Sequence, residues 1–155
     1  MSHPATPDLF QRPFNLQVER TVVRSAAVIY QAWTEHLDRW FAAPGSVLMT
    51  PKENTPFFFE TEHRMPGEAT ATRHPHYGRF LRLQSDNLIV LTWVTGPGGT
   101  EGVETVVSVE LSALASGHGT HVRLRHAGFG SAAARDRHAA AWPMVLEQME
   151  TKLKH

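Results

Sequence analysis

The regular part of the chain begins with an alternation of apolar and polar side chains. In NLQVERTVVR, residues 15–24, polar side chains separate Leu16, Val18 and Val22. This alternation predicts a β-strand with one buried face, because successive side chains of a strand point to opposite sides. Residues 1–13 carry three prolines and little periodicity, so we expect them to form a flexible lead-in.

Helical spacing follows this strand. Ser25 is a plausible N-cap for AAVIYQAWTEHLDRWF, residues 26–41. The apolar face of the first part contains Val28, Ala32 and Trp33. A second cap at Thr34 would restart the helix and place the next apolar side chains on one face of it. Those side chains are Leu37, Trp40 and Phe41. We therefore predict two short helices in tandem.

From residue 46 to residue 126, short β-branched and aromatic runs alternate with turn residues. We predict six strands here, at residues 46–50, 56–64, 77–84 with a longer lead-in, 87–94, 103–112 and 120–126. The connections between them are short and rich in the Gly, Asn, Asp and Pro residues that tight turns require. Because such connections join antiparallel neighbours, we predict an antiparallel sheet.

The last segment is helical. Ser131 is a plausible N-cap, and the helix would run to about Leu153. By helical count its inward stripe contains His138, Trp142, Leu146, Met149 and Leu153. Pro143 lies inside this stretch, where it lacks an N–H and should kink the helix. A helix of this length is long enough to cross a whole sheet.

In this order the elements predict an α+β fold, an antiparallel sheet with its helices on one face. We expect one domain over residues 14–155, because a single core commonly takes about 100 to 200 residues. An antiparallel sheet of this size twists and curves. A long helix across its concave face would then leave a gap at one end, where ligand pockets preferentially form.

Composition narrows the choice of partners. The 15 basic and 15 acidic side chains cancel and form no basic cluster, so we expect no nucleic-acid partner. No apolar run approaches the roughly 20 residues of a membrane span, and the first residues do not have the pattern of a signal peptide. Cysteine is absent, which fits a reducing compartment. We therefore expect a cytoplasmic protein without membrane contact.

Ten histidines make a metal site worth testing. The one close pair is His74 and His76. Pro75 between them argues for a loop or an edge strand, and no third ligand stands at a defined spacing. We predict no metal and no cofactor.

Three stretches resemble a known family. They are RTVVRSAAVIYQAWTEHLDRWF at 20–41, YGRFLRLQSDNLIVLTWV at 77–94 and VRLRHAGFGSAAARDRHAAAWPMVLEQM at 122–149. Their order and spacing are similar to the START-like (SRPBCC) superfamily, in the branch of the C-terminal domain of the activator of the 90 kDa heat-shock-protein ATPase. The similarity spans about Val18 to Leu153.

This resemblance implies a helix-grip fold, in which a curved antiparallel sheet wraps around the long C-terminal helix and two short helices follow the first strand. It also implies a hydrophobic cavity between that helix and the sheet. It does not imply one activity, since relatives bind lipids or aromatic metabolites, cyclise polyketides or assist a chaperone.

Two histidines are candidates for chemistry in such a cavity. His126 should lie on the inner face at the end of the strand 120–126, and His138 should point inward from the last helix beside Trp142. Imidazole titrates near neutral pH, so these side chains could bind a polar ligand group or move a proton. They could equally be structural histidines that pack the helix onto the sheet.

Large side chains are the second group of cavity candidates. They are Trp33, Trp40, Phe58, Trp93, Trp142 and Met149, within a wider aromatic set that also includes Phe41, Tyr77, Phe80 and Phe129. Aromatic rings supply the apolar surface of ligand pockets, but they also fill ordinary cores.

Polar anchors could come from Tyr77 and Arg79, which share one parity along their strand, or from Glu60 and Glu62, which share one along theirs. An inward pair would bind a polar ligand group, whereas an outward pair would be solvated. The consecutive phenylalanines at 57–59 leave the parity undecided.

Three functions remain. The first is the binding of a hydrophobic, lipid-like, polyketide-like or aromatic molecule in the cavity. The second is a cyclase, aromatase or hydrolase that uses a cavity histidine. The third is a chaperone-activating protein with a role in the stress response, which we rank last because the resemblance covers a single domain. Dimerisation through a sheet edge stays open.

Overall fold

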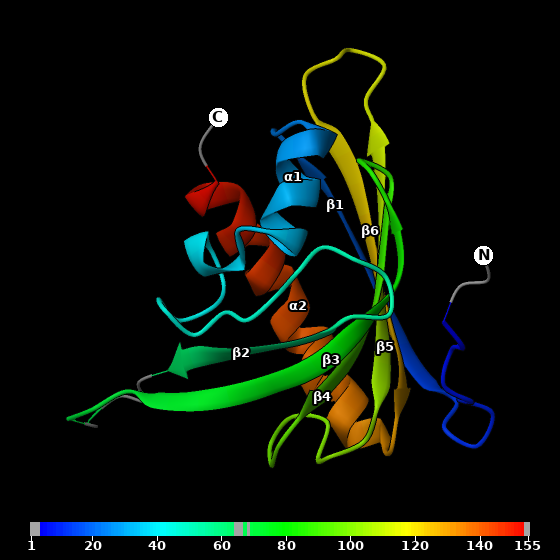
Figure 1. Cartoon of the computed structure of the whole chain (residues 1–155), viewed down its shortest axis with the longest axis vertical. Helices are drawn as coiled ribbons and strands as arrows, with labels where there is room; N and C mark the ends of the chain where they lie inside the picture. Colours follow the sequence, from blue (N-terminus) through cyan, green and yellow to red (C-terminus); the bar gives the residue numbers. More distant parts are fainter. Residues whose placement is uncertain (1–3, 64–66, 68, 154–155) are drawn as a thin grey trace.

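The computed structural model describes residues 4–63, 67 and 69–153. The elements are β1 (Phe14–Val22), α1 (Ala26–Thr34), the 3-10 turn η1 (Leu37–Arg39), β2 (Pro56–His63), β3 (Thr72–Gln84), β4 (Leu88–Thr95), β5 (Thr105–Ala113), β6 (Thr120–Phe129) and α2 (Ala132–Lys152). The strands form one antiparallel sheet in the order β1-β6-β5-β4-β3-β2. The sheet is curved, and α1 and α2 lie on its concave face (Figure 1). This confirms the predicted α+β helix-grip fold.

The start of α1 forms as predicted, and the second short helix is the single 3-10 turn η1. The Ser25 hydroxyl accepts a hydrogen bond from the Val28 N–H at 3.2 Å, and the inward face consists mainly of Ile29, Ala32 and Trp33. Thr34 is not a second cap, because its hydroxyl donates to the Tyr30 carbonyl of the same helix. The chain then forms only the three residues of η1 before Trp40.

The predicted strand at residues 46–50 was also wrong. Only one bridge forms there, in which Leu48 and Phe58 exchange backbone hydrogen bonds of 2.8 and 2.9 Å along the outer edge of β2. Leu48 itself is 70% exposed. The segment therefore covers part of a sheet edge and adds no strand.

The long helix α2 begins at the predicted cap, where the Ser131 hydroxyl accepts from the Ala134 N–H at 3.1 Å. Its buried stripe contains Ala134, Trp142, Leu146 and Met149, as the periodicity indicates. Pro143 lies inside the helix on its exposed side. The helix continues past it to Lys152, and a kink at this position stays a prediction.

Residues 4–13 form no helix or strand, yet they make specific contacts with the sheet. The Arg12 guanidinium donates to the carbonyls of Gly128 and Glu104 at 2.8 and 2.7 Å. Gly128 has φ +91°, and a Cβ on it would lie 2.6 Å from Leu9. Glycine is therefore required here both by the backbone conformation and by the packing of the lead-in.

Replacing Gly128 should destabilise the protein. We expect Gly128→Ala to lower the free energy of unfolding by about 2 kcal/mol, because alanine is strained at positive φ and its methyl group meets Leu9. Urea denaturation would measure the change. Gly130→Ala is the matched control, because only a Val103 methyl, at 3.3 Å, approaches its added Cβ. Equal stability of the two variants would contradict this account.

Candidate functional site

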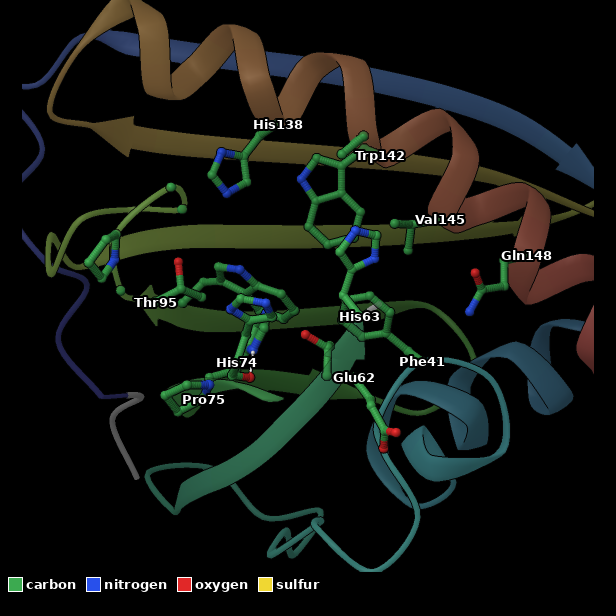
Figure 2. Close-up of a pocket in the computed structure, with 18 residues that line it drawn as sticks. Phe41, Glu62, His63, His74, Pro75, Thr95, His138, Trp142, Val145 and Gln148 are labelled. Carbon is green, nitrogen blue, oxygen red and sulfur yellow. Dashed lines mark hydrogen bonds between the residues drawn. The ribbon is translucent and has the colours of Figure 1, made fainter. Parts of the chain in front are cut away.

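A cleft of about 950 Å³ opens between α2, from His138 to Gln148, and one end of the sheet (Figure 2). The sheet side is formed by the end of β2, the start of β3, the end of β4 and the turn after it. The described lining residues are Phe41, Thr61, Glu62, His63, His74, Pro75, His76, Trp93, Thr95, Gly96, Pro97, Gly98, Gly99, His138, Ala141, Trp142, Val145 and Gln148.

Aromatic rings from three parts of the chain form the inner wall. The ring of Trp93 on β4 lies 5.5 Å from that of Trp142 on α2, measured between centroids. Phe41, which follows η1, stacks on Trp93 at 6.1 Å and lies 6.5 Å from Trp142. These three side chains make this wall of the cleft apolar.

His126 lies behind this wall and is completely buried. The Trp142 indole Nε1–H donates to His126 Nδ1 at 3.0 Å. On the other side of the ring, His126 Nε2 lies 2.7 Å from the Thr105 hydroxyl oxygen, and that hydroxyl donates to the Trp93 carbonyl at 2.6 Å. The chain of bonds thus connects α2 to β6, β5 and β4.

These bonds define the charge state of His126. Nδ1 must be an acceptor because an indole N–H can only donate, so Nε2 carries the single proton and donates to Thr105. Burial and the nearby His138 hold the pKa of His126 well below its ordinary value. The imidazole is therefore neutral, with both nitrogens occupied, and is closed to a ligand.

The bond from Trp142 to His126 should be measurable by comparing two tryptophans. Trp142 and Trp93 are both 3% exposed, but only the Trp142 indole has a described hydrogen-bond partner. We expect Trp142→Phe to cost about 1 to 2 kcal/mol more stability than Trp93→Phe, since it leaves the buried His126 Nδ1 without its donor. Chemical denaturation would compare the variants, and equal losses would argue against the bond.

His138 is half-buried and faces the cleft from α2 (Figure 2). Its Nδ1–H donates to the Ala134 carbonyl one turn earlier at 2.8 Å. Burial lowers its pKa, and the neighbouring Arg137 charge lowers it further. The ring also lies edge-on to His126 at 5.0 Å. His138 is thus the one of the two predicted histidines that reaches the cleft.

His76, from β3, forms part of the opposite wall. Its ring stacks on Phe59 at 4.6 Å and meets Trp93 edge-on at 5.1 Å. Its Nδ1–H donates to the His74 carbonyl at 3.0 Å. Burial lowers the pKa of His76 to about 4, so this imidazole is neutral at pH 7.

These buried histidines make stability fall on acidification. Histidine in the unfolded chain binds protons below about pH 6.5, whereas folded His76, with a pKa of about 4, stays mostly neutral until the pH approaches that value. Stability from this group is therefore complete above pH 6.5 and declines as the pH falls. We expect a slope of up to about 1.4 kcal/mol per pH unit for each such histidine.

Urea denaturation between about pH 7.5 and pH 5 would test this expectation, since the carboxylates titrate mostly below that range. His76→Phe keeps a ring on Phe59, and its stability should depend less steeply on pH than that of the natural protein. Identical slopes would mean that His76 is not held neutral by the fold.

The turn between β4 and β5 closes one end of the cleft. The Arg137 guanidinium, on α2, donates to the Gly98 and Gly99 carbonyls at 3.0 and 3.2 Å and to the Glu101 carboxylate at 3.2 Å. Within the turn, Thr95 and Thr100 exchange hydrogen bonds between side chain and backbone. The helix and the turn are therefore connected directly across this end.

The structure brings together three of the ten predicted cavity residues. Trp93, His138 and Trp142 line the cleft. His126 lies behind it, as described. Trp33, Trp40 and Met149 belong to the buried core and do not line the cleft. A ligand contact for any of these residues stays a prediction.

The other three candidates lie on the opposite face of the sheet. Phe59 packs inward against Trp93, so its neighbour Phe58 points outward, where it contacts Tyr77 at 5.3 Å between ring centroids. Tyr77 is half exposed. Arg79 shares this outward parity, and its guanidinium donates to Ala5 and Asn54. None of them lines the cleft.

Glu60 and Glu62 also have the outward parity and form ion pairs with Arg73 across the hairpin, at 3.4 and 3.6 Å. Glu62 nevertheless reaches the rim of the cleft. The inward positions are taken by Phe59, Thr61 and His63.

Sequence reasoning missed His76 as a cleft residue and named Phe41 only as a member of the wider aromatic set. His76 was considered only as a metal ligand in a loop, but it lies within β3, paired with Phe59 on β2 and Thr95 on β4. Pro75 pairs only with Glu60, because β4 ends opposite His76. The sequence contained one hint, since His76 and Phe80 share a parity, but only the structure shows that Phe80 is buried. Among the described residues, no three His, Cys, Asp or Glu side chains are arranged to hold a metal.

The curved sheet, the gripped helix and the cleft between them define a START-like (SRPBCC) protein of the helix-grip type. A family model described as Activator of Hsp90 ATPase homolog 1-like protein matches residues 24–154. The chain therefore belongs to this family. A comparison with curated protein sequences found no match.

Several solved structures share the fold at low sequence identity. Protein CV1439 from Chromobacterium violaceum superposes with a TM-score of 0.74 at 17% identity, over 92% of this chain and 99% of that one. An HSP90 activator from Plasmodium falciparum gives 0.65 at 18%, over 89% and 94%. The Aha1 dimer from Colwellia psychrerythraea gives 0.59 at 17%, over 90% and 95%.

No helix within the described part of the chain is both long and apolar enough to cross a membrane.

Proposed function

We propose that this protein binds a small, mainly apolar or aromatic molecule in the cleft between α2 and the sheet. The observation that carries the proposal is the cleft of about 950 Å³ with Phe41, Trp93 and Trp142 on its inner wall. Ligand pockets typically enclose about 300 to 1,000 Å³ and combine apolar walls with a few polar groups. Here His76 and His138 supply such groups beside the aromatic rings.

A second function is favoured by one observation, the exposure of a neutral imidazole to the cleft. His138 could act as a general base, whereas His126 could not, because both of its nitrogens are bonded inside the core. A base must reach a substrate proton within about 3 Å, directly or through one water. Binding requires fewer groups to be placed, and we rank it ahead of catalysis.

The names of two relatives bear on partners. One relative is called an HSP90 activator and another an Aha1 dimer. For this chain a homodimer and a chaperone partner are proposals that rank behind ligand binding, because the cleft with its aromatic wall supports ligand binding directly. The cytoplasmic location and a role in the stress response also stay predictions.

Native mass spectrometry of the protein purified from cells would test binding first. We expect a bound species of a few hundred daltons, sized to the cleft, that is lost on denaturation. Titration with the neutral fluorophore N-phenyl-1-naphthylamine would measure affinity independently. A protein that carries nothing from cells and does not bind the fluorophore would overturn the proposal.

Two neighbouring alanines on α2 provide a matched pair for this titration. Ala141 and Ala140 are both exposed, but only Ala141 lines the cleft. We expect Ala141→Trp to fill the cleft and weaken fluorophore binding at least about tenfold, the loss of roughly 1.4 kcal/mol. Ala140→Trp should leave it unchanged. Equal effects of the two substitutions would place the binding elsewhere.

A further inference from the structure

The hydrogen-bonding state of the two cleft histidines can be deduced from their backbone partners. A carbonyl oxygen only accepts, so His138 Nδ1 must carry a proton to bond Ala134, and His76 Nδ1 must carry one to bond His74. A neutral imidazole has one proton. In both rings Nε2 is therefore left as a lone-pair acceptor.

Neither acceptor is used by the described part of the protein. No described residue bonds Nε2 of His76 or of His138, and neither atom is among the buried side-chain atoms that lack a partner. Both atoms therefore remain accessible while their rings line the cleft. Figure 2 shows the His138 ring extending from α2 toward the opposite wall.

Other polar groups of the cleft can also accept a hydrogen bond from a ligand. The Gln148 amide donates to the Trp40 carbonyl at 2.6 Å, which leaves its oxygen free to accept. The hydroxyls of Thr61 and Thr95 can both donate and accept. The Trp93 indole is a donor without a described partner, and it can bond the oxygen of a hydroxyl or of an ether alike.

The charges of the lining residues also disfavour an anionic ligand. The titratable groups among the described lining residues are Glu62, His63, His74, His76 and His138. No lysine or arginine belongs to this part of the lining, so no permanent cation described there would pair with a carboxylate or a phosphate. Glu62 would repel such a group, although Arg73 offsets part of its charge.

We propose that the cleft selects an aromatic ligand that carries a hydroxyl group, a phenol, over the corresponding ether and over the corresponding carboxylate. The phenolic O–H donates to Nε2 of His138 or His76, and the phenolic oxygen can accept from Trp93. This inference rests on the proposed binding function and specifies the class of ligand.

The energetic basis is the cost of an unsatisfied acceptor. An ether of the same shape covers the histidine but cannot donate, so it removes water from Nε2 without replacing the bond. That penalty corresponds to about a 5- to 150-fold loss of affinity. A carboxylate loses more, because its charge leaves water without gaining a described cation.

Three probes that share one naphthalene ring system test this selection: 2-naphthol, 2-methoxynaphthalene and 2-naphthoate. Calorimetric titration at about pH 7.5 keeps ordinary histidines neutral. We expect 2-naphthol to bind at least about 5-fold tighter than the ether and tighter still than the carboxylate. Equal affinities, or a preference for the ether or the carboxylate, would overturn the assignment.

Variants identify the acceptors. His138→Phe and His76→Phe keep a ring in place and remove Nε2, so together they should abolish the preference for naphthol over its ether, because the ether then covers no unsatisfied acceptor and naphthol loses its bond. His118→Phe, in the exposed turn between β5 and β6, should keep the full preference. A preference that survives in the double variant would contradict the role of the histidines.

The outcomes separate this inference from the function on which it depends. If N-phenyl-1-naphthylamine binds in the cleft but the three naphthalenes show no hydroxyl preference, the ligand class is wrong and binding stands. If neither the fluorophore nor any naphthalene binds, both proposals fail. Should the histidine variants fail to fold, the three probes on the natural protein still decide.

Discussion

The architecture depends on one buried hydrogen-bonded imidazole. His126 accepts from Trp142 on the helix and donates to Thr105, which in turn donates to the Trp93 carbonyl. A buried polar group is costly unless it is hydrogen-bonded, and every polar side-chain atom of this network has a partner. The network therefore favours one position of α2 on the sheet. The two tryptophans that it connects also carry the aromatic wall of the cleft.

This arrangement separates two roles within a small space. His126 and His138 lie 5.0 Å apart between ring centroids, yet one has both nitrogens bonded inside the core and the other has Nε2 available to the cleft. The difference comes from the bonds of each ring, since a helix carbonyl occupies one nitrogen of His138 and leaves the second. Proximity to a cavity thus does not by itself make a histidine a functional group.

Much of the fold could be predicted from periodicity, because α2, β1 and the central strands each have one continuous buried face. The predictions failed where a few residues decide between similar local structures, as at Thr34, whose hydroxyl bonds back within α1. For the site, parity placed His126 and His138 inward. It could not orient β2 and β3, where Phe57, Phe58 and Phe59 are consecutive and only the pairing of Phe59 with His76 identifies the inner face.

The turn after β4 gives the cleft an end wall that is independent of its inner wall. It is held to α2 by Arg137, outside the hydrogen-bonded network that positions the helix. A change in the length of this turn would lengthen or shorten the cleft while the tryptophans and His126 kept their places. The same scaffold could then acquire ligands of different length through insertions or deletions at a single surface loop, which is where protein chains tolerate them most readily.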